Sequence, residues 1–222
     1  MGKLILSGFD PSPPVRAVKL TLAALQLPYD YVVVNPLTKD QHSPEYLKKN
    51  PQHTIPMLED DEQYISDSHA IITYLARKYG KDKALYPNDL YQSAIVDQRL
   101  HNDSSTMFTS TLLAISKPLM FAGQTVIEKS KIAAVADVYA LVETLLDNNN
   151  YVAGTHLTIA DFSFITTIVT LMVFLVPDSE KYPKLNAWLK RIKELPYYEE
   201  ASGAGAAQLE SMLKSKNFTI ES

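Results

Sequence analysis

Three short polar motifs near the start of the chain contain the residue types from which a site for a thiol compound could be built. The first, Ser12-Pro13-Pro14, places a hydroxyl where a strand-like segment gives way to a helix. A thiolate held there would accept a hydrogen bond from Ser12 and face the positive end of the helix dipole, and both effects lower a thiol pKa. The simpler interpretation is that Ser12 only caps the helix.

The second motif is Pro-Gln-His-Thr-Ile-Pro at residues 51–56. Because proline cannot donate to a sheet ladder, Pro56 predicts a sheet edge at which the backbone of Ile55 is free to pair with a peptide-like ligand. The sequence alone favours a trans Ile55–Pro56 bond, since only about 5–6% of such bonds are cis. His53 could bind a carboxylate, although a loop histidine is commonly just solvated.

The third motif is Asp67-Ser68-His69. An aspartate at the start of a helix is a good N-cap, and capping alone would explain Asp67. A carboxylate beside a hydroxyl and free backbone N–H groups also suits an amino-acid head group: the carboxylate would bind its ammonium, and the hydroxyl and N–H groups its carboxylate. Together the three motifs predict an extended, peptide-like ligand with charged groups at both ends.

Composition limits the classes of function. The chain has no cysteine, which excludes disulfides, thiolate metal sites and a Cys-x-x-Cys redox centre of its own. We expect no metal. The net charge of −4 provides no basic surface for nucleic acid. The most apolar stretch, residues 164–176, is shorter than the roughly 20 residues that span a bilayer. We therefore expect a cytoplasmic protein whose ligand supplies any reactive sulfur.

The first eighty residues alternate between strand and helix signals. The expected order is βαβαββα, with strands at 3–7, 29–34, 55–58 and 63–65, and helices at 13–25, 44–50 and 67–79. Ser43 followed by Pro44 marks one helix start, and Gly80 is expected at the C′ position after the last helix.

Helical patterns then replace the strand signals. They cover about 90–118 and 130–147, an apolar helix headed by a capping box of Thr158 and Asp161, and a stripe that includes Trp188. The chain therefore predicts an α/β domain at 1–80, a linker at 81–90 and an all-helical domain at 91–222.

Taken together, four motifs closely resemble cytosolic glutathione S-transferases: residues 12–14, 50–56, 67–71 and 158–162. The segment 195–200 resembles the insect delta/epsilon group, and within it the epsilon class. The resemblance implies a thioredoxin-like domain, a helical domain with a hydrophobic second-substrate site, and a homodimer. It also implies detoxification by conjugating glutathione to hydrophobic electrophiles, with a possible side activity on organic hydroperoxides.

The resemblance also implies roles for particular residues. Ser12 would stabilise the glutathione thiolate, the Ile55 backbone would pair with the cysteinyl amide, and Pro56 would be a cis-proline. Asp67 and Ser68 would bind the γ-glutamyl end, and His53 the glycyl carboxylate. The remaining residues expected on the glutathione side are Thr54, His69, Gln41 and His42. Those expected along the apolar wall are Pro11, Phe108, Leu112, Ile115, Leu119 and Phe121, each of which would suit an ordinary core equally well. Thr158 and Asp161 would be structural.

Three positions depart from the family pattern. Ser7 stands where relatives commonly have tyrosine, which leaves Ser12 as the candidate for thiolate activation. Gln41 stands where a histidine is common, and this predicts weaker binding of the glycyl carboxylate that Gln41→His would strengthen. Residues 110–113 lack the arginine that is frequent in epsilon relatives.

Two other functions are compatible with the sequence. The uncharged 110–113 segment and its apolar neighbours would suit a binding protein that sequesters apolar compounds with little turnover. A scaffold role is the third possibility. The apolar wall does not specify one electrophile, because an apolar pocket discriminates by only about 1–3 kcal/mol per methylene.

Overall fold

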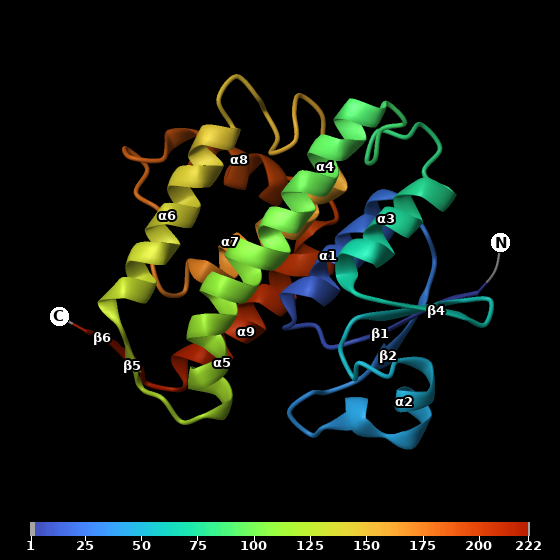
Figure 1. Cartoon of the computed structure of the whole chain (residues 1–222), viewed down its shortest axis with the longest axis horizontal. Coiled ribbons are helices and arrows are strands. Elements are labelled where there is room, and N and C mark those ends of the chain that lie inside the picture. Colours follow the sequence, from blue (N-terminus) through green and yellow to red (C-terminus); the bar gives the residue numbers. More distant parts are fainter. Residues whose placement is uncertain (1–2, 222) are drawn as a thin grey trace.

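The computed structural model describes residues 3–221 and confirms an α/β part followed by a helical part (Figure 1). The first part has the predicted βαβαββα order. Its elements are β1 (Leu4–Gly8), α1 (Pro13–Ala24), β2 (Asp30–Val33), α2 (Pro44–Lys49), β3 (Met57–Asp60), β4 (Gln63–Ser66) and α3 (Ser68–Tyr79). Most of these boundaries coincide with local sequence signals. For example, the Ser43 side chain accepts a hydrogen bond from the backbone N–H of Tyr46 and so caps α2, and Pro44 is the first residue of that helix. Gly80 is the C-cap of α3, one position before the expected C′ position, and its backbone is extended with φ −65° and ψ 121°.

The four strands form one sheet in the order β2-β1-β3-β4. β1 runs parallel to β2 and antiparallel to β3, and β3 runs antiparallel to β4. The prediction that Pro56 marks a sheet edge is wrong, because β3 lies between two strands and Pro56 precedes its first paired residue, Met57. The Ile55–Pro56 bond is cis, as the family resemblance implied and the base rate did not.

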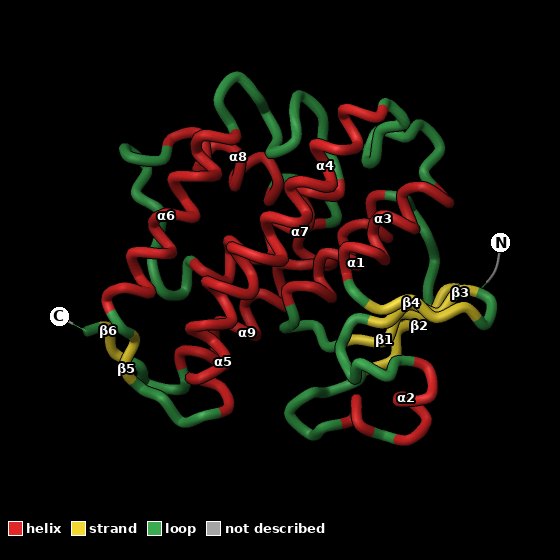
Figure 2. The backbone as a smooth tube through the Cα atoms, viewed as in Figure 1, coloured by secondary structure: helices red, strands yellow, loops and turns green. Residues whose placement is uncertain are grey.

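The helical part contains several long elements (Figure 2). They are α4 (Leu90–Asn102), a π-helical segment η2 (Asp103–Leu113), α5 (Ala114–Phe121), α6 (Lys129–Leu145), α7 (Ile159–Leu171), α8 (Pro183–Lys193), a π-helical segment η3 (Glu199–Gly203) and α9 (Ala204–Lys214). The predicted helix end at Pro118 is wrong, since this residue lies inside α5. A proline removes one backbone donor, and the buried neighbours Ile115 and Leu119 keep the helix packed past it.

Helix α7 is the centre of the helical part and is buried around almost its whole circumference. The predicted capping box is present: Asp161 accepts hydrogen bonds from the backbone N–H of Thr158 and of Val152, each at 2.9 Å. Its carboxylate also accepts one from Trp188 Nε1 at 2.9 Å, which ties α7 to α8. Within residues 3–221, no helix combines the length and apolar character needed to cross a membrane.

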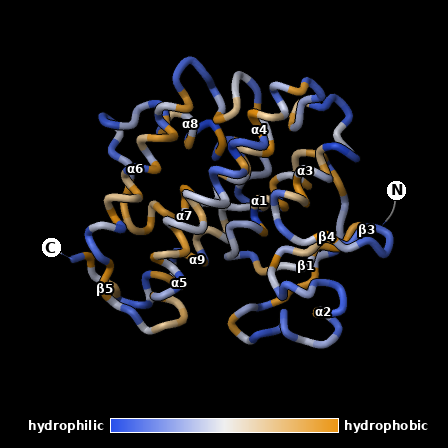
Figure 3. The backbone as a smooth tube through the Cα atoms, in the orientation of Figure 1, coloured by the Kyte–Doolittle hydropathy of each residue, from blue (hydrophilic) through white to orange (hydrophobic). Residues whose placement is uncertain are grey.

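Helix α1 joins the two parts of the molecule, because it packs against α3 on the sheet side and against α7 on the helical side. Hydrophilic backbone segments lie mainly at the periphery, for example around α2 and in the loops near α8 (Figure 3). The sequence did not predict the short parallel pair β5 (Val126–Ile127) and β6 (Thr219–Ile220), which holds the C-terminal end beside the α5–α6 connection.

Candidate active site

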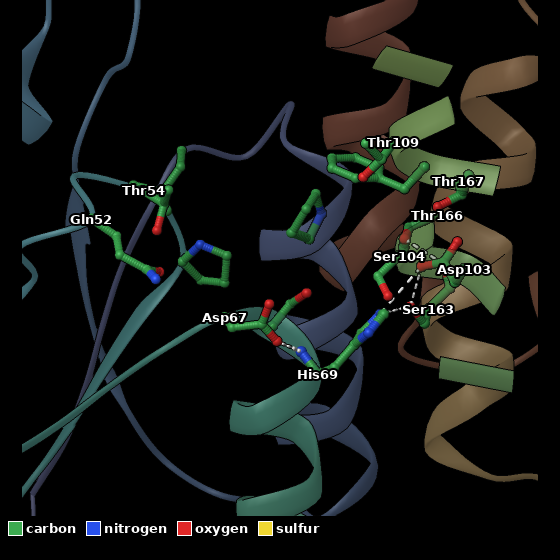
Figure 4. A pocket seen from close by; sticks show the side chains of 15 residues that line it. Gln52, Thr54, Asp67, His69, Asp103, Ser104, Thr109, Ser163, Thr166 and Thr167 are labelled. Carbon is green, nitrogen blue, oxygen red and sulfur yellow. Dashed lines mark hydrogen bonds and ion pairs between the residues drawn. The ribbon is translucent and has the colours of Figure 1, made fainter. Parts of the chain in front are cut away.

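Two adjoining cavities lie where the α/β part faces the helical part. The polar cavity, of about 240 Å³, is lined from the α/β side by residues including Gln52, Thr54, Asp67, Ser68 and His69, and from the helical side by Asp103, Ser104, Thr109, Ser163, Thr166 and Thr167 (Figure 4). The apolar cavity, of about 410 Å³, is lined by Ser12, prolines and the cavity-facing sides of α5 and α9. Thr54, Ile55 and Phe108 line both.

Ser12 lies in the lining of the apolar cavity, and its hydroxyl has no hydrogen-bond partner within residues 3–221. It is the N-cap residue of α1, yet its side chain makes no capping hydrogen bond, so the capping interpretation is wrong. Pro13 and Pro14 occupy the first two helical positions and have no N–H to offer an anion. The Ser12 hydroxyl is therefore a donor that this helix end can offer to an anion, supported by the helix dipole.

Hydrogen bonds from two neighbouring side chains fix the loop before β3. The carbonyl of Thr54 accepts hydrogen bonds from Tyr46 Oη at 2.6 Å and from Asn50 Nδ2 at 2.8 Å. His53 lies in the left-handed region with φ 47°. These constraints hold Ile55 in the lining of both cavities, one residue before the proline and two before the first strand pair.

Asp67 combines a capping role with a free oxygen. Its Oδ1 accepts hydrogen bonds from the backbone N–H of His69 at 2.9 Å and of Ala70 at 3.1 Å, which confirms the capping interpretation. Within the described chain, Oδ2 has no hydrogen-bond partner. The backbone of Asp67 has φ 73° and ψ 120°, a rare conformation for a residue with a side chain, and such strain gathers at binding sites.

His69 faces the helical part rather than open solvent (Figure 4). Its Nε2 lies 2.6 Å from Ser163 Oγ and 3.3 Å from Asp103 Oδ2, and the Ser163 hydroxyl donates to the same Asp103 oxygen at 2.5 Å. Asp103 is 4% exposed, and its Oδ1 is buried without a partner in residues 3–221. The polar cavity is therefore lined by a second carboxylate, whose Oδ2 is bound to Ser163 and whose Oδ1 is shielded from solvent.

Gln41, His42 and His53 form one end of the site. The rings of His42 and His53 lie 4.6 Å apart between centroids, at an interplanar angle of 32°. Gln41 and His53 line the apolar cavity, whereas His42 lines neither cavity and lies against His53. Gln41 Oε1 is buried without a hydrogen-bond partner within the described residues.

The apolar cavity differs from the predicted wall in one respect. Pro11, Phe108, Leu112 and Phe121 line it, but Ile115 and Leu119 are each only 2% exposed and belong to the core. The reason is the phase of α5: one residue along a helix turns the side chain by about 100°, so Ser116 and Met120 face the cavity instead. Among the residues that line this cavity, Lys117 alone carries a full charge, and it is exposed.

Comparison with known proteins agrees with this geometry. Residues 6–83 match the family model for the N-terminal domain of glutathione S-transferases, and residues 108–196 match the C-terminal domain model. The chain belongs to the glutathione S-transferase family. Two similar solved structures are isozyme E7 of Drosophila melanogaster (57% identity, TM-score 0.97, covering 99% of this chain and 100% of that one) and an epsilon-class enzyme from the housefly Musca domestica (55%, 0.97, 98% and 100%).

A third similar structure is a glutathione transferase homolog from Drosophila mojavensis with bound glutathione. It is 53% identical, with a TM-score of 0.96, and the alignment covers 99% of this chain and 100% of that one. The predicted family, including its epsilon class, and the predicted transferase activity toward glutathione are thus confirmed. The alternative of a carrier with little turnover is not favoured.

Most of the residues that line this transferase's polar cavity from the helical side were not predicted from the sequence. Asp103, Ser104, Thr109 and the hydroxyls of α7 lie in segments that read as ordinary helices. One signal was present: Ser163, Thr166, Thr167 and Thr170 follow i, i+3, i+4 and i+7 spacing on an otherwise apolar helix. Such a polar stripe on a buried helix indicates either a partner helix or a cavity, and here Ser163, Thr166 and Thr167 line the polar cavity.

Proposed function

We propose that glutathione lies across the polar cavity with its sulfur at Ser12 and attacks hydrophobic electrophiles held in the apolar cavity. The observation that carries this proposal is the uncommitted Ser12 hydroxyl in the apolar lining, next to Ile55, which lines both cavities. A thiolate at this point accepts the hydroxyl hydrogen bond and faces the second substrate. The proton of the thiol leaves to solvent before attack.

The γ-glutamyl end is assigned to the start of α3. The free Oδ2 of Asp67 suits an ammonium, and the Ser68 hydroxyl suits the neighbouring carboxylate. A charge-assisted hydrogen bond of this kind is about twice as strong as one between neutral groups. The arrangement therefore selects for an amino-acid head group rather than for any anionic tail.

The rest of the tripeptide is assigned to the loop before β3. The backbone of Ile55 pairs with the cysteinyl amide, because Ile55 precedes the first paired residue of β3 and its N–H has no partner within the described chain. His53, supported by its contact with His42, binds the glycyl carboxylate. Gln41 lies beside the glycyl end and provides a neutral amide where a histidine is common in relatives.

The test is the pKa of the glutathione thiol bound to the enzyme, followed by its ultraviolet thiolate absorbance, in the wild-type enzyme and in Ser12→Ala. We expect Ser12→Ala to raise this pKa and to lower kcat by about 10²–10³-fold, as for loss of one preorganised donor. Ser116→Ala is the matched control, since its hydroxyl lines the same cavity but is bound to the carbonyl of Leu112 at 2.8 Å. An unchanged thiol pKa in Ser12→Ala would refute the assignment.

Family membership supports further proposals about the whole molecule. We propose a cytoplasmic homodimer, an α/β domain at 1–80 and a helical domain at 91–222 joined by residues 81–90, in line with the family matches to 6–83 and 108–196. Light scattering tests the dimer. Turnover with a chlorodinitrobenzene-type electrophile and with an organic hydroperoxide tests the two reactions, and a protein active only on the hydroperoxide would overturn the conjugation role.

A further inference from the structure

Arg16 is a buried cation without an anionic partner. It lies in the first turn of α1 and is 1% exposed. In the described part of the chain its guanidinium binds only neutral oxygens: Nη2 donates to Thr170 Oγ1 at 2.9 Å and to the carbonyl of Thr166 at 3.2 Å, and Nη1 donates to Ser202 Oγ at 3.3 Å. Its Nε has no partner, and no carboxylate lies within ion-pair distance of it in residues 3–221.

This charge persists at neutral pH. Burial lowers the pKa of Arg16 to about 10, which still leaves the guanidinium protonated. The titratable group that faces it from the η3 side is Tyr198, whose own pKa burial raises, so this phenol stays neutral. Asp10, in the loop before α1, is bound to Lys19 at 2.9 Å. Buried charges are normally paired, so an unpaired one indicates that an anion arrives during function.

Arg16 lies next to the cavity that Ser12 lines. Its backbone N–H donates to the carbonyl of Ser12 at 3.1 Å, one helical turn away. Its partner Thr170 lines the apolar cavity, as Ser12 does. The guanidinium therefore lies directly behind a residue of the cavity wall, on the helix whose start carries the proposed thiolate donor.

We propose that Arg16 is a positioning residue whose buried charge favours the glutathione thiolate at Ser12 without touching the substrate. The thiolate is then the missing counter-charge. A nearby cation stabilises the thiolate strongly and the neutral thiol only slightly. The charge therefore lowers the pKa of the bound thiol and changes the affinity for glutathione as a whole very little. The inference rests on the proposed role of Ser12.

The main test compares Arg16→Gln, which removes the charge and keeps a hydrogen-bond donor, with Arg16→Lys, which keeps the charge. We expect Arg16→Gln to raise the pKa of the bound thiol by about one unit, a tenfold loss of thiolate at neutral pH. Turnover should fall at neutral pH and recover at alkaline pH. Arg16→Lys should stay close to the wild type, and the affinity for S-methylglutathione, which has no thiol, should be unchanged in both.

A purely structural role makes different predictions. Arg16 also ties α1 to α7 and to η3, so Ser202→Ala, which removes one of those bonds but leaves the charge, is the matched control. If Ser202→Ala raises the thiol pKa as much as Arg16→Gln, or if a folded Arg16→Gln keeps the wild-type pKa, the proposal is wrong. A loss of S-methylglutathione affinity that accounts for the whole loss of activity would also overturn it.

Salt provides a test on the wild-type enzyme that does not depend on how any variant folds. A buried charge is screened little by salt, so the bound thiol pKa should stay nearly constant as ionic strength rises. A pKa that climbs steeply with salt would assign the effect to surface charges instead. Ser12→Ala separates the proposed role of Ser12 from that of Arg16. If Ser12→Ala leaves the pKa of the bound thiol unchanged, the proposed site is wrong. If the thiol pKa rises in Ser12→Ala but not in Arg16→Gln, only the role of Arg16 is overturned.

Discussion

The polar and apolar cavities share Thr54, Ile55 and Phe108, yet their walls are built in different ways. The polar wall consists of hydrogen-bonding groups whose positions are fixed from behind, such as the Thr54 carbonyl held by Tyr46 and Asn50. The apolar wall consists of prolines and helix faces, with adaptable side chains such as Met120 and an exposed Phe121.

The difference shows how one site combines a prescribed ligand with a variable one. A site built to hydrogen-bond a ligand rejects analogues that lack the matching group by about 10⁴–10⁵-fold, whereas an apolar pocket discriminates by about 1–3 kcal/mol per methylene. The polar cavity should therefore specify one compound. The apolar cavity should accept a class of electrophiles and rank them only weakly.

The sharpest test of this contrast is Asp67→Asn. Asparagine caps a helix as well as aspartate does, so the fold should be preserved while the ammonium loses its charged acceptor. We expect the KM for glutathione to rise by about 10–100-fold, from the loss of a charged hydrogen bond. The order of preference among electrophiles should stay the same, and Asp61→Asn in the nearby exposed turn should change neither quantity. A reordered electrophile preference would break the contrast.

Low pH should weaken the hydrogen bonds that Asp60 makes between β3 and α3, next to the polar cavity. Burial alone would raise the pKa of Asp60, but hydrogen bonds from Lys78, Tyr79 and Tyr74 outweigh it and hold the pKa below its ordinary value. These bonds tie β3 to α3. A carboxylate with a lowered pKa in the folded state contributes stability that is fully present above its unfolded pKa of about 3.9 and lost as pH falls through the folded value.

Asp60→Asn should therefore lower the free energy of unfolding by about 2 kcal/mol at neutral pH, from weakened hydrogen bonds to a charged group. The difference from the wild type should shrink as pH falls below about 4. Urea denaturation at several pH values measures both effects. A difference that stays constant down to the lowest pH would show that Asp60 is not ionised in the folded protein.

The smallest effect is expected in the apolar wall. Phe121 is 62% exposed, so Phe121→Ala should cost little stability. We expect kcat/KM for bulky electrophiles to change by about fivefold, corresponding to roughly 1 kcal/mol of apolar contact, with the glutathione KM unchanged. Val176→Ala, an exposed apolar residue outside this cavity, is the control. A large change in the glutathione KM would show that the two cavities are coupled.

Local signals were sufficient for the α/β half of the site. Ser12 before two prolines, Ser43 before Pro44, and Asp67 before a helical stripe each mark a helix start within a few residues, and all three helices begin there. Properties that depend on neighbouring elements were predicted less well. Pro56 was expected at a sheet edge and lies before an interior strand, because strand order is decided by pairing between distant segments.

The sequence by itself determined the order of elements, the polar residues of the α/β wall and, by resemblance, the family. Only the tertiary structure decided which side of α5 faces the cavity, since helical periodicity gives the spacing of Ile115 and Leu119 but not the direction they face. The packing of α7 against α1 likewise decided that Arg16 is buried. An arginine one turn after Ser12 carries no sign of burial in the sequence, because burial depends on a helix about 150 residues further along the chain.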